Sequence, residues 1–247
     1  MRNFFDFTGK KYLITGASSG IGRSTAIELS NQGARVVLVA RDEKRLEETL
    51  QQMAGTEHRV IPLDLAKTDD LSNLMAGAVE DGLPIDGIVH CAGVGSLLPL
   101  SLLNRTSMND CMKVNFYSFI ELVRCGTKKK FRAPRMSIVA MSSVSALYPK
   151  KCQTIYAASK AALNTAIQAL AVELADKGVR INSICAGAVD TRMTQDAAKA
   201  ASNFELNPQT LGILRPEQIA CSIMYLLSDA SSNMTGRFLF ADGGMVL

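Results

Sequence analysis

Seven short apolar runs recur along the chain, and amphipathic segments separate them. Within each run the apolar residues are continuous rather than alternating, which is typical of strands covered on both faces. The runs span 12–14, 36–40, 60–63, 85–90, 136–141, 179–185 and 238–240. The helical patterns between them span about 21–32, 43–53, 71–80, 108–125, 155–177 and 216–227. Strand followed by helix, repeated in this way, predicts an α/β fold with a doubly wound, mostly parallel seven-stranded sheet and helices on both faces.

No Pro- or Gly-rich linker interrupts this alternation, although 247 residues are enough for two domains. We therefore expect residues 1–247 to form a single domain. One segment, 192–214, interrupts the alternation of strands and helices with polar and small residues. Insertions after the carboxyl end of a strand are where such sheets place a substrate lid. We expect a lid here, and an inert excursion is the alternative.

Charge and cysteine content exclude several classes of protein. Lys+Arg 27 against Asp+Glu 23 gives a net charge of +4 that is spread along the chain, so no nucleic-acid surface is expected. The six cysteines form no C-x-x-C pair and there are two histidines, so we expect no metal site. Reduced, buried thiols in a cytoplasmic protein are expected instead. No apolar run approaches the roughly 20 residues that span a bilayer, and the first residues lack the apolar core of a signal peptide.

A Gly-rich turn directly follows the first apolar run. It reads Thr-Gly-Ala-Ser-Ser-Gly-Ile-Gly over 15–22 and precedes an amphipathic segment. Glycines permit a tight turn and a close backbone approach to a pyrophosphate, whose charge interacts with the N–H groups at the start of the helix. In this strand, turn and helix context the pattern predicts a dinucleotide site. The residues expected to bind are Gly16, Ser18, Ser19, Gly20, Ile21 and Gly22.

The ends of the next two runs indicate which dinucleotide is bound. Ala40-Arg41 offers a cation where a cofactor with a free ribose 2′-hydroxyl requires a carboxylate. We therefore predict NADP(H), with Arg41 at the 2′-phosphate and Arg23 as a weaker second candidate. A surface arginine at the start of a helix is the alternative. Asp64-Leu65 ends the third run, where the carboxylate can accept from the adenine amino group or cap a helix.

A tyrosine and a lysine four residues apart form a candidate reacting pair. Tyr156 and Lys160 share one face of a helix. At an effective dielectric near 20, a unit charge about 4 Å away lowers a tyrosine pKa of about 10 by up to about 3 units, which makes the phenol usable as a proton donor or acceptor. Such a pair also occurs by chance in many helices. Ser143 closes the fifth run at a carboxyl end, so it is expected in the same crevice, unless Ser142-Ser143 merely starts a turn.

Several further motifs follow one another in a fixed order over almost the whole chain. They are T-G-x-x-x-G-x-G at 15–22, Asp64, Ala92-Gly93, Lys113-Val114-Asn115, Ser143, Tyr156 with Lys160, Arg180-Ile181-Asn182, Thr191 and Asp242-Gly243-Gly244. With these spacings the chain resembles the short-chain dehydrogenase/reductase family. The resemblance implies a single-domain Rossmann fold that uses a nicotinamide dinucleotide to interconvert carbonyl and alcohol.

The resemblance also implies roles for individual residues. Tyr156 would be the general acid/base, Ser143 would hydrogen-bond the substrate oxygen, and Lys160 would hold the nicotinamide ribose while tuning Tyr156. Asn115 would position a water that feeds protons through Lys160. The cofactor-binding residues implied in addition are Tyr156, Lys160, Ala92, Gly93, Gly187 and Thr191. A homotetramer built on helices 108–125 and 155–177 is implied as well, with a homodimer as the runner-up.

The chain departs from the family pattern in two places. His90-Cys91 stands where N-N is usual, and Ala186 stands where Pro is usual before Gly187. We expect His90 to be structural, tying neighbouring strands, rather than catalytic. Cys152, four residues before Tyr156, either borders the substrate pocket or is buried as a small apolar residue.

The sequence leaves the substrate open. The overall layout resembles the 3-ketoacyl-carrier-protein reductase type, and an acidic carrier protein has basic positions to bind at 128–130, Arg132 and Lys177. The alternative is that these lysines are exposed at the end of a helix, where positive charge interacts favourably with the helix dipole. A reductase of a small free ketone, sugar, steroid or quinone is the second enzyme hypothesis. A non-catalytic nucleotide-sensing protein is disfavoured by the presence of Ser143, Tyr156, Lys160 and Asn115.

Overall fold

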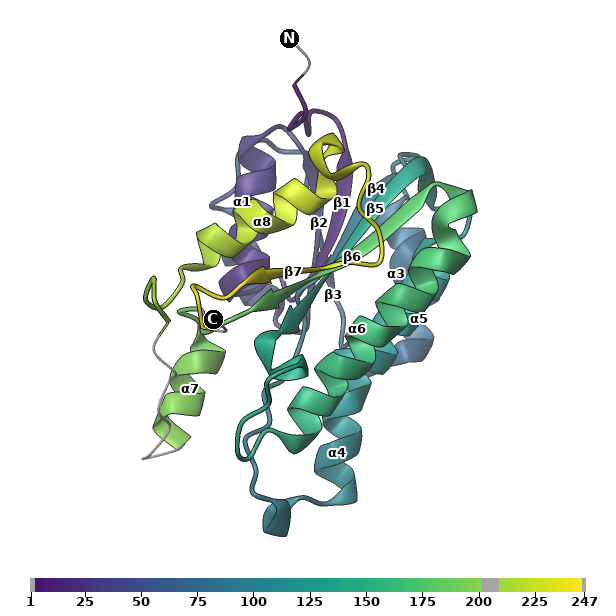
Figure 1. Ribbon diagram of the computed structural model, residues 1–247. Coiled ribbons are helices and arrows are strands. Elements are labelled where there is room, and N and C mark those ends of the chain that lie inside the picture. Colours follow the sequence, from purple (N-terminus) through teal and green to yellow (C-terminus); the bar gives the residue numbers. More distant parts are fainter. Residues whose placement is uncertain (1–2, 201–208, 246–247) are drawn as a thin grey trace.

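The computed structural model describes residues 3–200 and 209–245, and its centre is one parallel sheet (Figure 1). The strands are β1 (Lys11–Thr15), β2 (Arg35–Ala40), β3 (Arg59–Pro62), β4 (Ile85–His90), β5 (Arg132–Ser143), β6 (Val179–Ala186) and β7 (Phe238–Ala241). They lie in the order β3-β2-β1-β4-β5-β6-β7, and every neighbouring pair is parallel. The predicted doubly wound α/β architecture is confirmed.

Helices cover both faces of this sheet (Figure 1). They are α1 (Gly20–Asn31), α2 (Glu43–Leu50), α3 (Leu71–Ala78), α4 (Arg105–Met112), α5 (Ser118–Gly126), α6 (Thr154–Leu174), α7 (Arg192–Ala200) and α8 (Pro216–Leu227). One core joins the sheet to α3, α5 and α6, and the other joins it to α1, α2 and α8. Successive residues of β1 enter opposite cores, with Leu13 in the first and Tyr12 and Ile14 in the second. This double burial explains why the strands are continuously apolar.

The predicted helix 108–125 is interrupted. A π-helical turn, Lys113–Tyr117, joins α4 to α5, and Asn115 lies buried within it. Such turns insert one residue into an α-helix and are frequent at functional sites. One extra residue does not disturb the apolar pattern enough to be visible in the sequence.

The chain reverses its winding direction between β1 and β4. After β1 it proceeds outward to β2 and β3, whereas β4 returns to the other side of β1 and leads outward to β7. The loops that leave the carboxyl ends of β1 and β4 therefore diverge, which opens the crevice where doubly wound sheets bind ligands.

The basic residues considered for carrier docking lie at the opposite edge of the sheet. Arg132 begins β5 and Lys177 comes just before β6, whereas Ser143 ends β5. At about 3.3 Å per residue, β5 separates Arg132 from Ser143 by about 36 Å. The Lys130 ammonium lies 4.7 Å from the centre of the Phe131 ring. This geometry does not place a carrier protein bound there near the carboxyl ends.

The six cysteines are free, but they differ in burial. Cys111, Cys125 and Cys185 are buried, as expected. Cys221 is exposed, because it lies on the side of α8 away from the buried residues Ile219 and Ile223. Within the described ranges, no helix combines the length and the apolar character needed to cross a membrane.

Candidate active site

The turn between β1 and α1 requires glycine. Gly16 has a φ of +70°, and a Cβ atom there would lie 2.8 Å from the Ala92 nitrogen. A Cβ atom on Gly22 would collide with the Gly16 carbonyl. The turn therefore packs directly against the chain that leaves β4. Ser19 precedes α1, and its side chain does not hydrogen-bond to the backbone N–H groups of the first helical turn. A ligand can therefore bind these groups.

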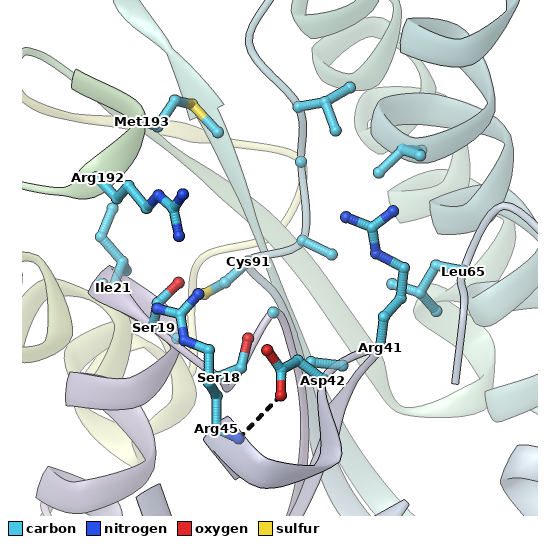
Figure 2. A pocket seen from close by; sticks show the side chains of 18 of the residues that line it. Ser18, Ser19, Ile21, Arg41, Asp42, Arg45, Leu65, Cys91, Arg192 and Met193 are labelled. Carbon is cyan, nitrogen blue, oxygen red and sulfur yellow. Dashed lines mark hydrogen bonds between the residues drawn. The ribbon is translucent and has the colours of Figure 1, made fainter. Parts of the chain in front are cut away.

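A cavity of 380 Å³, the first cavity, lies over this turn (Figure 2). Its volume is within the range of about 300–1,000 Å³ that is typical of small-molecule sites. The expected cofactor residues that line it are Gly16, Ser18, Ser19, Gly20, Ile21, Gly22, Arg41, Asp64, Leu65, Ala92, Gly93 and Thr191. The structure thus brings residues from the ends of four strands and from the segment after β6 into one cavity.

Arginines supply the positive charge of the first cavity. Arg41, Arg45 and Arg192 all line it. In Figure 2 the Arg45 side chain lies beside Ser19, whereas Arg41 extends on the other side of Asp42. The Asp42 carboxylate accepts a hydrogen bond from the backbone nitrogen of Arg45 at 3.1 Å and so caps α2. The acid next to Arg41 is thus already engaged at the start of a helix.

Arg23 does not serve the first cavity. Its Nε donates to the Thr49 hydroxyl at 3.0 Å, and Nη2 donates to the Ser18 carbonyl at 2.7 Å. Nη2 also lies 3.4 Å from a Glu48 carboxylate oxygen. The expectation that Arg23 is a second phosphate-binding cation is therefore wrong, because its guanidinium braces the Gly-rich turn against α2.

Asp64 lines the first cavity and does not cap a helix. Its Oδ1 accepts from the Ala66 nitrogen at 3.0 Å, which closes a tight local turn after β3. The residue also lines the first cavity. The carboxylate is held in place by that turn but is not consumed by a helix cap, since α3 begins only at Leu71.

A second cavity, of 130 Å³, lies at the ends of β5 and β6. Ser143 and Tyr156 line it together with Gly187. Met193 lines both cavities, so the two adjoin. The predicted crevice therefore contains two adjoining cavities, a larger one and a smaller one.

Burial dominates the electrostatics of the reacting pair. It lowers the pKa of Lys160 to about 8, and the Lys160 Nζ donates to the Met141 carbonyl at 2.8 Å. Nζ lies 5.9 Å from the centre of the Tyr156 ring. Burial raises the pKa of Tyr156, and a hydrogen bond with the Ser143 side chain opposes that rise. The expected lowering of the Tyr156 pKa by Lys160 is therefore not found. Desolvation of the phenol outweighs the effect of the Lys160 ammonium, which is hydrogen-bonded to the Met141 carbonyl.

Asn115 ties three segments together. Its Oδ1 accepts from the Val94 nitrogen at 2.8 Å, and its Nδ2 donates to the Val94 carbonyl at 3.1 Å and to the Ser159 hydroxyl at 3.0 Å. A Cβ atom on Gly93 would lie 3.3 Å from Asn115 Oδ1 and 3.5 Å from Lys160 Nζ. The amide thus fixes the chain after β4 against the π-helical turn and α6.

The structure explains the departure at His90, and it places Ala186, the other departure, between Ser143 and Ala241 in the sheet. His90 is fully buried, and its Nδ1 lies 3.0 Å from the Thr15 hydroxyl, which connects β4 to β1 as expected. Cys91 lines the first cavity, and burial raises its thiol pKa to about 12. A Cβ atom on Gly187 would lie 2.7 Å from the Asp242 carbonyl oxygen. Gly187 lines the second cavity rather than the first, so the structure gives it a packing role.

Cys152 fits neither alternative that the sequence left open. It is partly exposed and does not line the second cavity, although Lys150 and Gln153 on either side do. Its φ of 67° is unusual for a residue with a side chain. Its carbonyl accepts from the Leu98 nitrogen at 3.0 Å and so connects this loop to the segment after β4.

The segment expected to be a lid begins as α7 and borders both cavities. Thr191 and Arg192 line the first cavity, and Thr194 lines the second. Residues 201–208 of the segment lie outside the described residues. The ends of the segment meet in a bridge between Val189 and Leu214.

Sequence reasoning missed other residues that line the cavities. In the first cavity these are Ala40, Asp42, Arg45, Leu63, Cys91 and Val114. In the second they include Tyr148, Lys150, Gln153 and Met245. Position relative to a motif was the available signal: Arg45 lies four residues after Arg41, and Lys150 and Gln153 lie between Ser143 and Tyr156.

Comparison with known proteins identifies the family. A family model described as enoyl-(acyl carrier protein) reductase matches residues 16–246. The chain belongs to the short-chain dehydrogenase/reductase family. As a member, it is an oxidoreductase that acts on alcohol or carbonyl groups.

Relatives of this short-chain dehydrogenase/reductase differ in substrate. Glucose 1-dehydrogenase of Gluconobacter oxydans is 31% identical, over 98% of this chain and 93% of that enzyme. The 3-oxoacyl-[acyl-carrier-protein] reductase of Thermotoga maritima is also 31% identical, over 97% and 98%. A solved 3-oxoacyl (acyl-carrier-protein) reductase from Agrobacterium tumefaciens with NADP bound is 28% identical, with a TM-score of 0.87 over 99% of this chain and 98% of that one.

Proposed function

We propose that this short-chain dehydrogenase/reductase uses NADP(H) to reduce a carbonyl compound to an alcohol, with Tyr156 as the general acid. The observation that carries this proposal is that Ser143 and Tyr156 line the same small cavity, which adjoins the large one. A substrate in the second cavity then faces both hydroxyl groups and the end of a ligand in the first. In the reverse direction Tyr156 would accept the alcohol proton.

The first cavity fits a nicotinamide dinucleotide phosphate. Gly16 and Gly22 allow the turn to pack tightly on itself and on the chain after β4, and the start of α1 offers N–H groups for the pyrophosphate. Asp64 would accept from the adenine amino group, and Arg41 with Arg45 would bind the 2′-phosphate. The relative solved with NADP bound agrees with this choice. When bound, the nicotinamide supplies or accepts the hydride.

The protein residues supply the proton and the geometry. The Ser143 hydroxyl donates a hydrogen bond to the carbonyl oxygen, which favours the negative charge that develops there. The Tyr156 hydroxyl transfers its proton to that oxygen. Because burial keeps the Tyr156 pKa high, the phenol is protonated at neutral pH and ready to donate. Lys160, whose Nζ would lie 3.5 Å from a Cβ atom on Gly93 in the wall of the first cavity, would hold the nicotinamide ribose.

Asn115 is proposed as a positioning residue. Its side-chain amide is committed to Val94 and Ser159, so it is not available as the main ligand of a relay water. Its contribution would be to hold Gly93 and the π-helical turn next to Lys160. This changes the role implied by the family resemblance from binding a water to shaping its surroundings.

A homo-oligomer is also proposed. Small residues on α6, namely Ala158, Ala161, Ala162, Ala166 and Ala169, are exposed or partly exposed, and Val172 on the same helix is 81% exposed. Such a surface suits close helix packing between subunits. Light scattering after size-exclusion chromatography tests for a tetramer, with the dimer as the second possibility.

Consumption of NADPH in the presence of candidate carbonyl compounds tests the proposed activity. The panel would contain free ketones, sugars, steroids, quinones and 3-oxoacyl thioesters, and each would also be tried with NADH. Oxidation of NADPH that depends on substrate and is lost in Tyr156→Phe supports the proposal. Equal rates in the wild type and in Tyr156→Phe would overturn it.

A further inference from the structure

The second cavity is small, and apolar and polar side chains line it together. Leu97, Val144, Met193 and Met245 contribute apolar side chains around Ser143 and Tyr156, and further hydroxyl and amide side chains share the lining. Its 130 Å³ is well below the roughly 300 Å³ at which drug-sized sites begin. A small substrate, or only the end of a longer one, fits between these walls.

One cation lies in this lining. Among the described residues that line the second cavity, Lys150 carries the one positive charge, and none is Asp, Glu, Arg or His. Lys150 is partly buried, and no ion pair joins it to a carboxylate elsewhere in the described chain. Burial lowers the pKa of its ammonium. A positive charge in the wall of the cavity, with no carboxylate in that wall to balance it, is complemented by an anionic group on the ligand.

The loop that carries Lys150 is held in place. The backbone nitrogen of Lys150 donates to the side-chain carbonyl of Gln153 at 2.9 Å, and Gln153 is itself buried. Gln153 immediately precedes α6, the helix that carries Tyr156. The backbone of Lys150 is therefore held next to the start of the helix that carries the general acid, whereas the neighbouring Lys151 is exposed and does not line the cavity.

Resting on the proposed reductase function, we propose that the substrate is a small oxo acid whose carbonyl binds at Ser143 and Tyr156 and whose carboxylate pairs with Lys150. The anion is expected to be close to the carbonyl, because Lys150, Ser143 and Tyr156 line the same cavity of 130 Å³. A phosphate on a long carrier arm would lie outside. The carboxylate is unchanged in the reaction, which reduces the carbonyl carbon by hydride from NADPH and takes the proton from Tyr156. Lys150 is thus a specificity residue.

Matched pairs of substrates test this proposal. Short-chain oxo acids and their methyl esters share a carbonyl and differ in charge. The wild type is expected to show a higher kcat/KM for the acids. In Lys150→Met the kcat/KM for the acids is expected to fall about tenfold or more, through KM, toward that of the esters. Lys151→Met, which removes a neighbouring charge outside the cavity, is expected to keep the preference for the acids.

A binding measurement separates this proposal from the reductase function. Unreactive saturated carboxylates of the same length are expected to raise the melting temperature of the wild type with NADP⁺, and not that of Lys150→Met. If neither acids nor esters are reduced, the reductase proposal fails while this measurement still decides on the anion site. Equal kcat/KM for acids and esters in the wild type, or an equal loss for both in Lys150→Met, would overturn the oxo-acid proposal. So would Lys150-dependent turnover confined to phosphopantetheine thioesters.

Discussion

The imidazole Nδ1 of His90 lies 3.0 Å from the Thr15 hydroxyl, across the two strands between which the sheet reverses its winding. The Thr15 oxygen also accepts from the Ala92 nitrogen at 3.3 Å. One side chain therefore connects the end of β4, the end of β1 and the start of the loop that lines the first cavity. The strand ends that form the crevice are held at a fixed separation by this connection.

Acid is expected to weaken the fold through His90. Burial lowers the His90 pKa from its ordinary 6.5 to about 3, so between these values the unfolded chain binds a proton that the folded chain does not. The contribution of neutral His90 to the free energy of unfolding is fully present above pH 6.5. It falls as the pH drops toward 3, by up to about 1.4 kcal/mol per pH unit. Urea unfolding at several pH values is expected to show a shallower dependence in His90→Asn.

The slope, rather than the absolute stability, is the readout of this experiment, because the substitution also changes packing. His58→Asn, at the other histidine, serves as the control and is expected to retain the steep dependence. An unchanged slope in His90→Asn would show that other groups cause the acid sensitivity.

Removal of the Tyr156 hydroxyl is expected to abolish most of the turnover. Tyr156→Phe keeps the ring but loses the proton that is donated to the substrate, so kcat is expected to fall about a hundredfold or more. NADPH binding, followed by its fluorescence, is expected to persist. Tyr225→Phe is a matched control, since its hydroxyl bonds to Met234 Sδ at 3.5 Å on the far side of the sheet from α6. Comparable losses in both variants would argue against a specific role.

Cofactor preference is expected to depend on Arg41. In Arg41→Gln the affinity for NADPH is expected to fall about tenfold relative to that for NADH, because a charge-assisted bond to the 2′-phosphate is lost. Titration of each nucleotide against the apoprotein measures this ratio. Lys44→Gln removes an exposed charge from α2 that does not line the first cavity and is expected to leave the ratio unchanged. A wild type that binds NADH more tightly would contradict the assignment.

Two glycines with similar backbones are expected to respond differently to alanine. Gly16 and Gly82 have φ values of +70° and +78°, so both substitutions cost about 1–2 kcal/mol in backbone strain. At Gly82 no atom lies within 4 Å of the added Cβ, whereas at Gly16 the Ala92 nitrogen is 2.8 Å away. Gly16→Ala is therefore expected to lose more unfolding free energy and also NADPH affinity. Equal losses in the two variants would contradict the close packing of this turn.

Strong local signals made much of the fold predictable. The strand at 85–90 and the helix at 216–227 have the predicted bounds, the latter because Pro216 starts the helix. Gly178 follows the last helical turn before β6 and has the left-handed φ of 71°, a conformation that glycine adopts without strain. By contrast, β5 begins four residues before the predicted run, because Arg132 and Pro134 conceal its start.

The site was predictable where its residues belong to motifs, and not where tertiary burial decides. The Gly-rich turn, Arg41 and Thr191 were found because their spacing is local or characteristic. The Tyr156 pKa was expected to fall, but it rises, because burial cannot be read from a helix spacing. Lys150 and Met245 were missed because loops bring them to the second cavity from positions without a pattern.

The bridge between Val189 and Leu214 holds the two ends of the excursion together. The Asp190 backbone nitrogen donates to the Leu214 carbonyl at 2.8 Å, and the Leu214 nitrogen donates to the Ala188 carbonyl at 3.1 Å. Once the ends are joined, each doubling of the length of chain between them costs only about 0.6 kcal/mol of closure entropy. We therefore expect changes of length within this excursion to be tolerated while Tyr156 and Lys160, which lie outside it, keep their places.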